Sequence, residues 1–461
     1  MSISLESDIF QPAVLLAVFL GLGVIILIFF IKWIKQGQSG EGDEIDDKND
    51  KVKNFPADAS GKHRKKEQTG SVKGVSKKKL AERENRRTAR ANDKGFNHPW
   101  LLATLKGHGG RVLDMDFSPN GKYLVSCSDD RTVFIWEAKD LANKERKSLR
   151  VNVEFDFATH VKWSPDCKAF IIHRFNENSL EVYKVEKKKD GWLSANKALT
   201  FPKAHETDVI GMGIASNGKF IMTCSNKTDL VIWDLKGDQL AKVDTFLMST
   251  TCAKISPCGR FVVASGFTPE AKAWEVTFDK SGEFKEVKQV PQLTLGGHTS
   301  GVYDVAFDVD SSHMSTVSKD GTWRLFDTKV NYKQGQDARL DISGHYELAS
   351  NSSLVALSPN AEVLVVANAS DLQFFSTMTG KLDYTIENLS EDHISSLLFD
   401  ASGKYLLVAA DRKILVFHNI TGYRCGIVHA KEKLKEHQTS ATRERLQQLI
   451  KASEEFLKNF E

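Results

Sequence analysis

From residue 101 onward, short apolar runs alternate with tight polar turns, and one pattern of runs and turns returns along the chain. An apolar run ends in a turn resembling Ser-Pro-x-Gly, and a second run rich in β-branched and aromatic residues follows. After another polar turn, a third run ends in Trp, Tyr or Phe. Short runs of this composition, bounded by turn residues, predict antiparallel strands. Each copy of the pattern therefore predicts a strand meander.

The pattern occurs seven times at nearly regular intervals. Its turn position is held in order by Gly121, Cys167, Gly218, Gly259, Ser311, Ala361 and Gly403, so successive copies lie 46, 51, 41, 52, 50 and 42 residues apart. A period of about 40–50 residues is typical of the blades of a β-propeller. The last copy supplies only three strands, whereas residues 99–106 precede the first copy as a single apolar run. We therefore expect this first strand to complete the last blade and close the ring.

Residues 13–31 form a nineteen-residue run without a charged side chain, which is followed by Lys32 and Lys35. At about 1.5 Å per residue, a helix of this length crosses the ~30 Å hydrocarbon core of a bilayer. A cleaved secretory signal and a buried globular helix are the alternatives. The preceding residues carry Glu6 and Asp8 instead of a basic n-region, which favours an uncleaved anchor. Because basic flanks stay on the cytoplasmic side, we expect the remaining chain to face the cytosol.

The segment after the anchor is polar, highly charged and nearly free of aromatic residues. It cannot bury enough apolar surface to offset the entropy of ordering, so we expect a disordered linker. Between residues 61 and 90, twelve Lys or Arg residues face three Glu. This block suits RNA phosphates or anionic lipid headgroups, and a solvated spacer is the alternative. The candidate contacts are Lys62, Arg64, Lys65, Lys66, Lys77, Lys78, Lys79, Arg86, Arg87 and Arg90.

Near the C-terminus, apolar side chains recur every three or four residues at Leu446, Ile450, Leu457 and Phe460, with Ser453 interrupting the stripe. This spacing predicts an amphipathic helix, which either packs against the propeller or forms a coiled coil with a partner. The predicted segments are residues 1–12, a short N-terminal stretch; 13–34, a transmembrane anchor; 35–97, the charged linker; 98–425, the propeller; and 426–461, the C-terminal helix.

The composition of the chain restricts the class of protein to which it belongs. The 461 residues are 41% apolar and 27% charged, with a formal net charge of +3, which suits a large globular core flanked by solvated tails. Six cysteines are scattered without the paired spacing of a metal site: Cys127, Cys167, Cys224, Cys252, Cys258 and Cys425. Scattered thiols are typical of small core residues in a reducing compartment.

Histidine, serine and aspartate recur within the repeats and raise the question of a hydrolytic triad, which needs the three groups in mutual contact. Three histidines each precede the terminal aromatic residue of their repeat by 28 residues: His108, His205 and His298. A periodic histidine indicates a structural role. Residues 107–111 lack the G-K-[ST] ending of a phosphate-binding loop, and no H-E-x-x-H or C-x-x-C motif occurs. We therefore expect a protein that is not an enzyme and has no cofactor, metal or small-molecule substrate.

The repeats resemble those of the WD40 family of β-propellers, through the Gly-His pairs at 107–108 and 297–298 and the Trp-Asp pair at 233–234. The resemblance implies an all-β, seven-bladed propeller, in which a His, a strand Ser or Thr, a turn Asp and a Trp form a buried hydrogen-bonded tetrad within a blade. In the first repeat either Ser126 or Ser128 could supply the hydroxyl, and we take Ser128. The implied tetrad residues are His108, Ser128, Asp130, Trp136, His205, Trp233, His298, Ser318 and Asp320.

Two departures weaken the implied tetrads. Lys227 stands at the position of Asp130 in the third repeat, and Phe326 stands at the position of Trp136 in the fifth. A lysine cannot accept a hydrogen bond from histidine, and a phenylalanine cannot donate one. We therefore expect the full tetrad in the first repeat and partial networks in the other two.

A narrower resemblance, to membrane-anchored members of the WD40 family, extends along nearly the whole chain and includes the segments "SVSKDGTW" and "RERLQQ". It implies a single-pass endoplasmic-reticulum protein with a cytosolic propeller. That propeller would contact the stress kinase PERK and associate with mRNA or ribosomes in stress-regulated translation. The alternative is a substrate receptor of a ubiquitin ligase. The W-D-x-R motif of that class is absent, since Leu235 and Lys236 follow the Trp-Asp pair.

Overall fold

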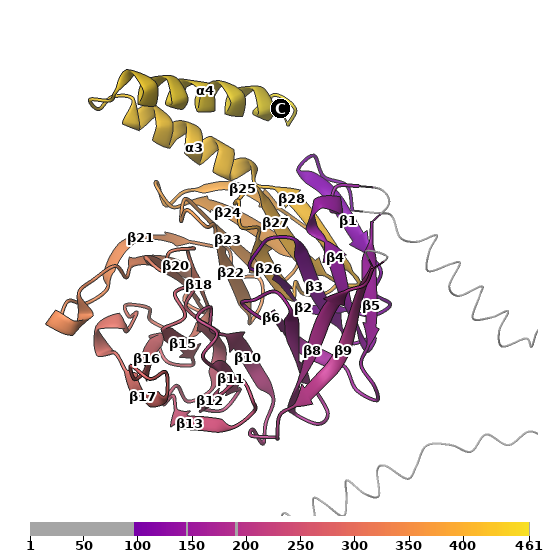
Figure 1. The fold of residues 1–461 in the computed structure, drawn as a ribbon. Coiled ribbons are helices and arrows are strands. Elements are labelled where there is room, and N and C mark those ends of the chain that lie inside the picture. The colour runs from indigo at the N-terminus through magenta and orange to yellow at the C-terminus, as the bar shows by residue number, and fades with distance from the viewer. Residues whose placement is uncertain (1–95, 144–145, 190–191, 461) are drawn as a thin grey trace, which may run out of the picture. The chain divides into compact units, whose positions relative to one another are not determined.

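The structure is a computed structural model that describes residues 96–143, 146–189 and 192–460. Within these ranges the chain forms seven four-stranded antiparallel sheets, which are the blades of a propeller (Figure 1). The seven predicted repeats are thereby confirmed as seven blades. The anchor predicted at residues 13–34 and the linker up to residue 95 lie outside the described residues. No helix in the described ranges is both long and apolar enough to cross a membrane.

Blades one to four follow the chain in order. Blade one contains β2 (Val112–Phe117), β3 (Tyr123–Ser128), β4 (Thr132–Glu137) and β5 (Ser148–Asn152). Blade two contains β6 (Ala158–Trp163), β7 (Ala169–Arg174), β8 (Ser179–Lys187) and β9 (Leu193–Thr200). Blade three contains β10 (Val209–Ile214), β11 (Ile221–Ser225), β12 (Asp229–Trp233) and β13 (Gln239–Asp244). Blade four contains β14 (Thr250–Ile255), β15 (Phe261–Gly266), β16 (Lys272–Phe278) and β17 (Phe284–Gln289).

The remaining strands complete the ring. Blade five contains β18 (Val302–Phe307), β19 (His313–Ser318), β20 (Thr322–Asp327) and β21 (Arg339–His345). Blade six contains β22 (Ser353–Leu357), β23 (Val363–Asn368), β24 (Asp371–Ser376) and β25 (Leu382–Ile386). Blade seven contains β26 (Ser396–Phe399), β27 (Tyr405–Ala410), β28 (Lys413–His418) and β1 (Leu101–Lys106). Short 3₁₀ turns occupy Ala138–Asp140, Pro291–Leu293 and Tyr332–Gln334.

The N-terminal strand closes the ring, as the unpaired first run predicted. β1 lies antiparallel to β28, with Thr104 opposite Leu415 and Leu105 opposite Ile414. Leu105 is 1% exposed and packs in the apolar cluster that contains Trp136. That cluster draws on blades seven and one, so the first strand joins two blades that are far apart in sequence. The closure leaves no unpaired outer edge on β28.

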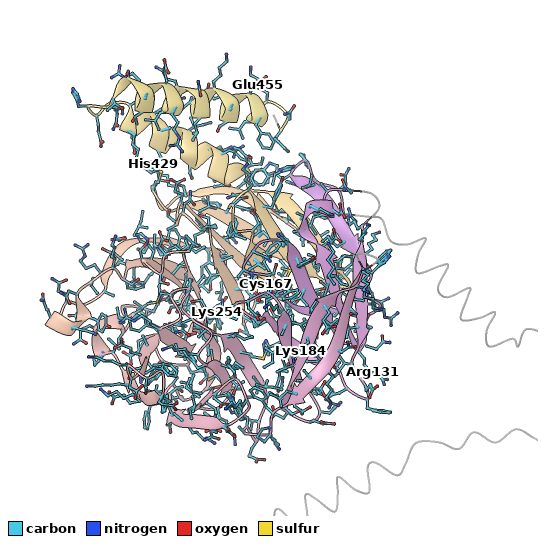
Figure 2. All side chains as sticks on the ribbon, viewed as in Figure 1. Arg131, Cys167, Lys184, Lys254, His429 and Glu455 are labelled. Atoms are coloured by element: carbon cyan, nitrogen blue, oxygen red, sulfur yellow. The ribbon has the colours of Figure 1, made fainter. Side chains whose placement is uncertain are left out.

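Polar contacts between neighbouring innermost strands add to these apolar clusters. Lys162 Nζ of β6 lies 2.7 Å from the Asp114 carboxylate of β2, and Lys254 Nζ of β14 lies 2.8 Å from that of Asp304 on β18. Figure 2 shows Lys254 near the middle of the ring. Burial alone would raise the pKa of Asp114, but the Lys162 and His160 charges and hydrogen bonds bring it well below its usual range. These ion pairs therefore join blade one to blade two and blade four to blade five.

After β28 the chain forms two helices, α3 (Ile420–Lys433) and α4 (Ser440–Leu457), where the sequence pattern predicts one. α3 begins ahead of the expected boundary at residue 426, and its Asn419 cap accepts a hydrogen bond from the Gly422 N–H. Phe456 and Phe460 place their rings 5.4 and 5.3 Å from the ring of His418. The end of the amphipathic helix therefore packs on the propeller, as the first of the two interpretations had it.

Candidate functional site

The first blade holds a buried hydrogen-bond network around His108. His108 Nε2 lies 2.8 Å from Ser126 Oγ, and Trp136 Nε1 donates to the same oxygen at 3.0 Å. At the opposite edge of the imidazole, His108 Nδ1 lies 3.1 Å from Thr132 Oγ1. The Thr132 hydroxyl donates to the Asp130 carboxylate at 2.5 Å. The four residue types implied by the family resemblance are therefore brought together, with Thr132 as an additional member.

The hydroxyl of this network belongs to Ser126, so the choice of Ser128 was wrong. Trp136 of β4 stands opposite Leu124 of β3, which puts Ser126 two positions from the direct partner and Ser128 four positions away. Only the nearer diagonal position is within reach of an indole side chain. Ser128 instead accepts a hydrogen bond from the Asp130 N–H at 3.2 Å, at the turn that follows the strand.

Blade five has the same network geometry, and there too the predicted hydroxyl was the wrong one. His298 Nε2 lies 2.8 Å from Thr316 Oγ1, and its Nδ1 lies 3.1 Å from the Asp320 carboxylate. Ser318 was the predicted hydroxyl, but its Oγ donates to the Gly301 carbonyl at 2.9 Å. Burial would raise the pKa of Asp320, but hydrogen bonds from Thr322 and the Thr299 N–H lower it to about 2. The carboxylate is therefore ionised at neutral pH.

Blade three has the partial network that its sequence indicates. His205 Nε2 lies 2.7 Å from Thr223 Oγ1, and Trp233 Nε1 donates to that oxygen at 2.9 Å. His205 Nδ1 is buried without a hydrogen-bond partner; Lys227 stands at the position of Asp130, and Asp229 at that of Thr132, which bonds Nδ1 in blade one. Burial lowers the pKa of His205 to about 4, so the ring is neutral at physiological pH. In all three blades the hydroxyl lies 18 residues after the histidine, but a serine also lies 20 residues after it, at Ser128, Ser225 and Ser318, so the spacing alone could not identify it.

We expect Ser126→Ala to lower the free energy of unfolding by about 1–3 kcal/mol, because His108 and Trp136 would lose a shared buried partner. Ser128→Ala is the matched control, since it removes one hydrogen bond to a turn N–H and should cost less, on the order of 1 kcal/mol. Denaturant unfolding of both variants measures the difference. Equal losses would show that the two hydroxyls are equivalent and would contradict the assignment.

Blade two has no tetrad, and a buried ionic network stands in its place. Arg174 Nη1 lies 3.0 Å from the Glu181 carboxylate and 2.7 Å from that of Glu177. Arg174 Nε lies 3.5 Å from the Asp156 carboxylate, and Lys197 Nζ lies 2.5 Å from that of Glu181. The side chains of Arg174, Asp156 and Glu181 are 8%, 1% and 3% exposed. Arg174 stands at the repeat position of Ser128, but the sequence pattern does not indicate which carboxylates it contacts.

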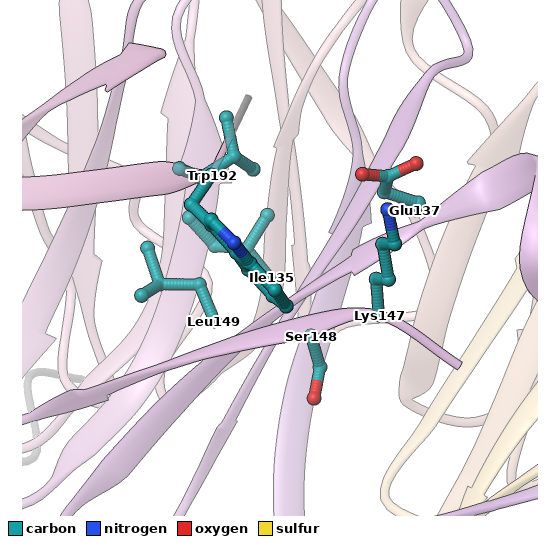
Figure 3. A pocket seen from close by; sticks show the side chains of 7 residues that line it. Ile135, Glu137, Lys147, Ser148, Leu149 and Trp192 are labelled. Atoms are coloured by element: carbon teal, nitrogen blue, oxygen red, sulfur yellow. The ribbon is translucent and has the colours of Figure 1, made fainter. Parts of the chain in front are cut away.

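Figure 3 shows a pocket near the outer strands of blades one and two. Trp192 and Leu149 line it, and Lys147 places its ammonium 5.6 Å from the centre of the Trp192 ring. Its volume is about 120 Å³. Sites for drug-sized molecules usually enclose about 300–1,000 Å³, so this pocket does not suit a small-molecule ligand.

The tetrads have a structural role. Ser126 and His108 resemble a nucleophile and its base, but Ser126 is 0% exposed and its oxygen also accepts the Trp136 N–H. A substrate could not reach that oxygen without unfolding the blade. Among residues 96–143, 146–189 and 192–460, no group of three or more His, Cys, Asp or Glu side chains could hold a metal ion. The ten basic candidates from Lys62 to Arg90 lie outside these ranges.

Comparison with known proteins agrees with this geometry. The family described as "WD domain, G-beta repeat" matches residues 99–137 and 289–327, the two stretches that carry the networks of His108 and His298. The guanine nucleotide-binding protein subunit beta of Zea mays is 22% identical over 335 residues, covering 70% of this chain and 83% of its own.

Two relatives are much more similar. Transducin beta-like protein 2 of Homo sapiens is 41% identical over 430 residues, covering 93% of this chain and 92% of its own. Transducin beta-like protein 2 of Mus musculus is 43% identical over 384 residues, covering 83% of this chain and 86% of its own. Members of the WD40 propeller class generally act as protein-binding scaffolds, and the buried histidine networks of this chain supply no catalytic group. With similarity of this degree over nearly its whole length, the chain belongs to the transducin beta-like protein 2 family of WD40 propellers.

Proposed function

We propose that this chain is a single-pass protein of the endoplasmic-reticulum membrane whose propeller faces the cytosol and acts as a scaffold. Its partners are proteins, the stress kinase PERK among them, together with mRNA or ribosomes in stress-regulated translation. The observation that carries the proposal is the order of the parts. An uncharged run at 13–31 with Lys32 and Lys35 after it, and then a basic linker, precede a propeller whose buried polar groups serve its own stability.

The linker and the propeller contribute different surfaces to this scaffold. The basic block at 61–90 suits phosphates, and binding of that kind weakens steeply with salt. Propeller loops present side chains to protein partners. A role as ubiquitin-ligase receptor has less support, because Lys236 stands where the W-D-x-R motif of that class has arginine.

Membrane topology is the decisive test, because every cytosolic partner depends on it. Five N-x-[ST] sequons occur, of which Asn351 and Asn388 are exposed, whereas Asn368 and Asn419 are buried. We expect the expressed protein to carry no N-linked glycan, and protease added to intact microsomes to remove the propeller. Western blots with a C-terminal epitope measure both.

A charge-reversed variant is the matched control, because it tests whether the sequons are glycosylated when the propeller is lumenal. Changing Lys32 and Lys35 to Glu and adding arginines ahead of residue 13 reverses the charge bias across the anchor. In that variant we expect glycans at the two exposed sequons and protection of the propeller from protease. If the unaltered chain shows a glycosidase-sensitive mobility shift, or its propeller is digested only after detergent is added, the propeller is lumenal and the proposal fails.

A further inference from the structure

Five large apolar side chains stand exposed on the loops of blades two to four. Phe155 is 90% exposed, Met248 79% and Phe246 71%, while Phe267 is 58% and Phe175 43% exposed. These five residues are called the aromatic rim below. They form two groups, Phe155 with Phe175 on the loops of blade two and the other three on the loops of blade four, with blade three between them. Single exposed apolar residues are common on protein surfaces, whereas several together are typical of an interaction site.

The strand order places the aromatic rim at one end of the ring. In a four-stranded antiparallel blade, the loop that enters the innermost strand lies at the same end as the turn between the second and third strands. Phe155 lies in the β5–β6 loop and Phe175 in the β7–β8 turn. Phe246 and Met248 lie in the β13–β14 loop, and Phe267 follows β15. All five side chains therefore belong to the same face of the propeller.

The backbone holds this face in a strained conformation. Phe155, Phe246 and Met248 have positive φ angles of 60°, 51° and 65°. The left-handed region is unfavourable for bulky residues, and strain of this kind is concentrated at functional sites. Since these side chains are exposed, packing of the side chains themselves does not account for their identity.

Buried anchors fix the loops that carry the aromatic rim. The Asp156 carboxylate, beside Phe155, accepts N–H groups of Asn176 at 3.0 Å and of Phe157 at 2.8 Å. The rings of Phe157 and Phe175 stack with centroids 4.8 Å apart. These contacts join the β5–β6 loop to the β7–β8 turn, so this part of the surface is formed before any partner arrives.

Hydrogen bonds also join the β13–β14 loop to the turn that follows β15. The Phe267 N–H donates to the Ser249 carbonyl at 3.0 Å, and Leu247, between the two exposed side chains Phe246 and Met248, is 0% exposed. Lys272 Nζ donates to the Phe246 carbonyl at 3.2 Å. A preformed surface loses little conformational entropy on binding, which favours affinity.

The charges around the aromatic rim are mainly negative. Four exposed carboxylates lie on the loops of this sector: Glu154, Glu177, Glu206 and Asp208. Two exposed lysines, Lys203 and Lys227, oppose these four carboxylates, so the exposed charges on these loops sum to −2. Glu206 is paired with Lys203 at 3.2 Å and Glu177 with Arg174 at 2.7 Å, so the open carboxylates are Glu154 and Asp208. At the opposite end of the ring, five of the seven turns between the first two strands carry an exposed basic residue: Lys122, Lys168, Lys219, Arg260 and Lys404.

We propose that the aromatic rim is the docking surface for a basic peptide segment of a partner protein that carries bulky apolar side chains. Apolar side chains of the segment would cover the exposed rings, and its Lys or Arg residues would pair with the surrounding carboxylates or stack on the rings. RNA also stacks on aromatic side chains, but its phosphates are repelled by an acidic surface. The inference rests on the proposed scaffold function and specifies the partner class of one face.

The test uses the full chain purified in detergent and a displayed library of random short peptides. Selected peptides should be enriched in Lys or Arg together with Leu, Met, Ile or aromatic residues, and their affinity should fall with salt. Enrichment of acidic peptides, or the absence of any enriched class, overturns the proposal. So does displacement of the selected peptides by single-stranded oligouridine, because that would assign the face to RNA.

Variants locate the binding to the aromatic rim. The double variant Phe155→Asn with Phe246→Asn removes two exposed rings, and asparagine tolerates a positive φ, so the melting temperature should not fall. We expect its affinity for the selected peptides to drop at least about tenfold. The matched control is Leu235→Asn with Val309→Asn, two apolar residues that are 50% and 58% exposed on turns at the opposite end.

The control should bind as the unaltered chain does. Equal affinity of the rim variant and the unaltered chain would overturn the proposal, and so would equal losses in the rim and control variants. Because peptide affinity is measured in solution, the result is separate from membrane topology. A lumenal propeller that binds basic peptides would refute the proposed function alone, and a cytosolic propeller that binds none would refute this inference alone.

Discussion

Arg174→Ala is expected to lower the free energy of unfolding by about 3–5 kcal/mol, measured by denaturant unfolding. The substitution leaves Glu181 and Asp156 buried, with side chains only 3% and 1% exposed, without the guanidinium that neutralises both. Glu181 keeps the hydrogen bond from the Tyr183 hydroxyl and the ammonium of Lys197. Those two partners compensate part of the charge, whereas no second cation contacts Asp156 in the part of the chain that the structure describes.

The matched control is Lys197→Ala. Its ammonium lies closer to the Glu181 carboxylate than Arg174 does, at 2.5 Å, but the lysine side chain is 51% exposed. Ion pairs open to solvent contribute about 0–1 kcal/mol, so the loss should be small. If Lys197→Ala loses as much stability as Arg174→Ala, burial does not govern the contribution, and the argument for the blade-two network fails. Loss of Arg174 should also release the loop of Phe155, since Asp156 anchors it.

The number of blades and the closure of the ring could be predicted because both follow from the repeat pattern. Each copy of the repeat carries the same apolar positions, and the seventh copy lacks a strand that the run before the first copy supplies. Burial of one apolar face per strand fixes these features whatever the loops contain. The observed pairing of β1 with β28 could therefore be predicted by counting the strands of each repeat.

The hydroxyl of the tetrad was missed for a different reason. Ser126 and Ser128 stand two positions apart on one strand, so both point to the same face. The apolar pattern gives no preference between them, and only the register against Trp136 decides. Comparing the three histidine repeats does not help, because Ser or Thr occupies both positions in each of them.

Two other features lay beyond the sequence pattern. Helix α3 contains Gly422 and Gly426 together with Thr421, residues of low helix propensity, and it forms because Ile420 and Cys425 are buried against the propeller. Tertiary packing, not helix propensity, therefore determines that such a segment is helical. The ionic network of blade two combines residues from a loop, a turn and three strands, and neither their spacing nor their residue types indicate in the sequence that they are in contact.

Leu105→Asp is expected to open the ring. Leu105 is 1% exposed between blades seven and one, so the carboxylate must either be buried without a partner or leave with its strand. The first outcome costs on the order of 4 kcal/mol or more. The second leaves β28 as an unpaired edge, which pairs readily with other chains. We therefore expect a large loss of stability together with concentration-dependent association in sedimentation velocity.

The neighbouring Lys106→Asp variant is the control, because Lys106 lies in the same strand, is exposed, and should cost less than about 1 kcal/mol. It introduces the same carboxylate one residue away, on the solvent side of the strand. β1 precedes the first copy of the repeat and completes the blade of the last, and contacts such as the Val112 N–H with the Asp411 carbonyl at 2.8 Å also join these two blades. We expect the apolar side chains of β1 to be needed for closure in addition to such hydrogen bonds. A monomeric Leu105→Asp variant with the stability of the unaltered chain would show that the six other blades hold the ring without that strand's core contact.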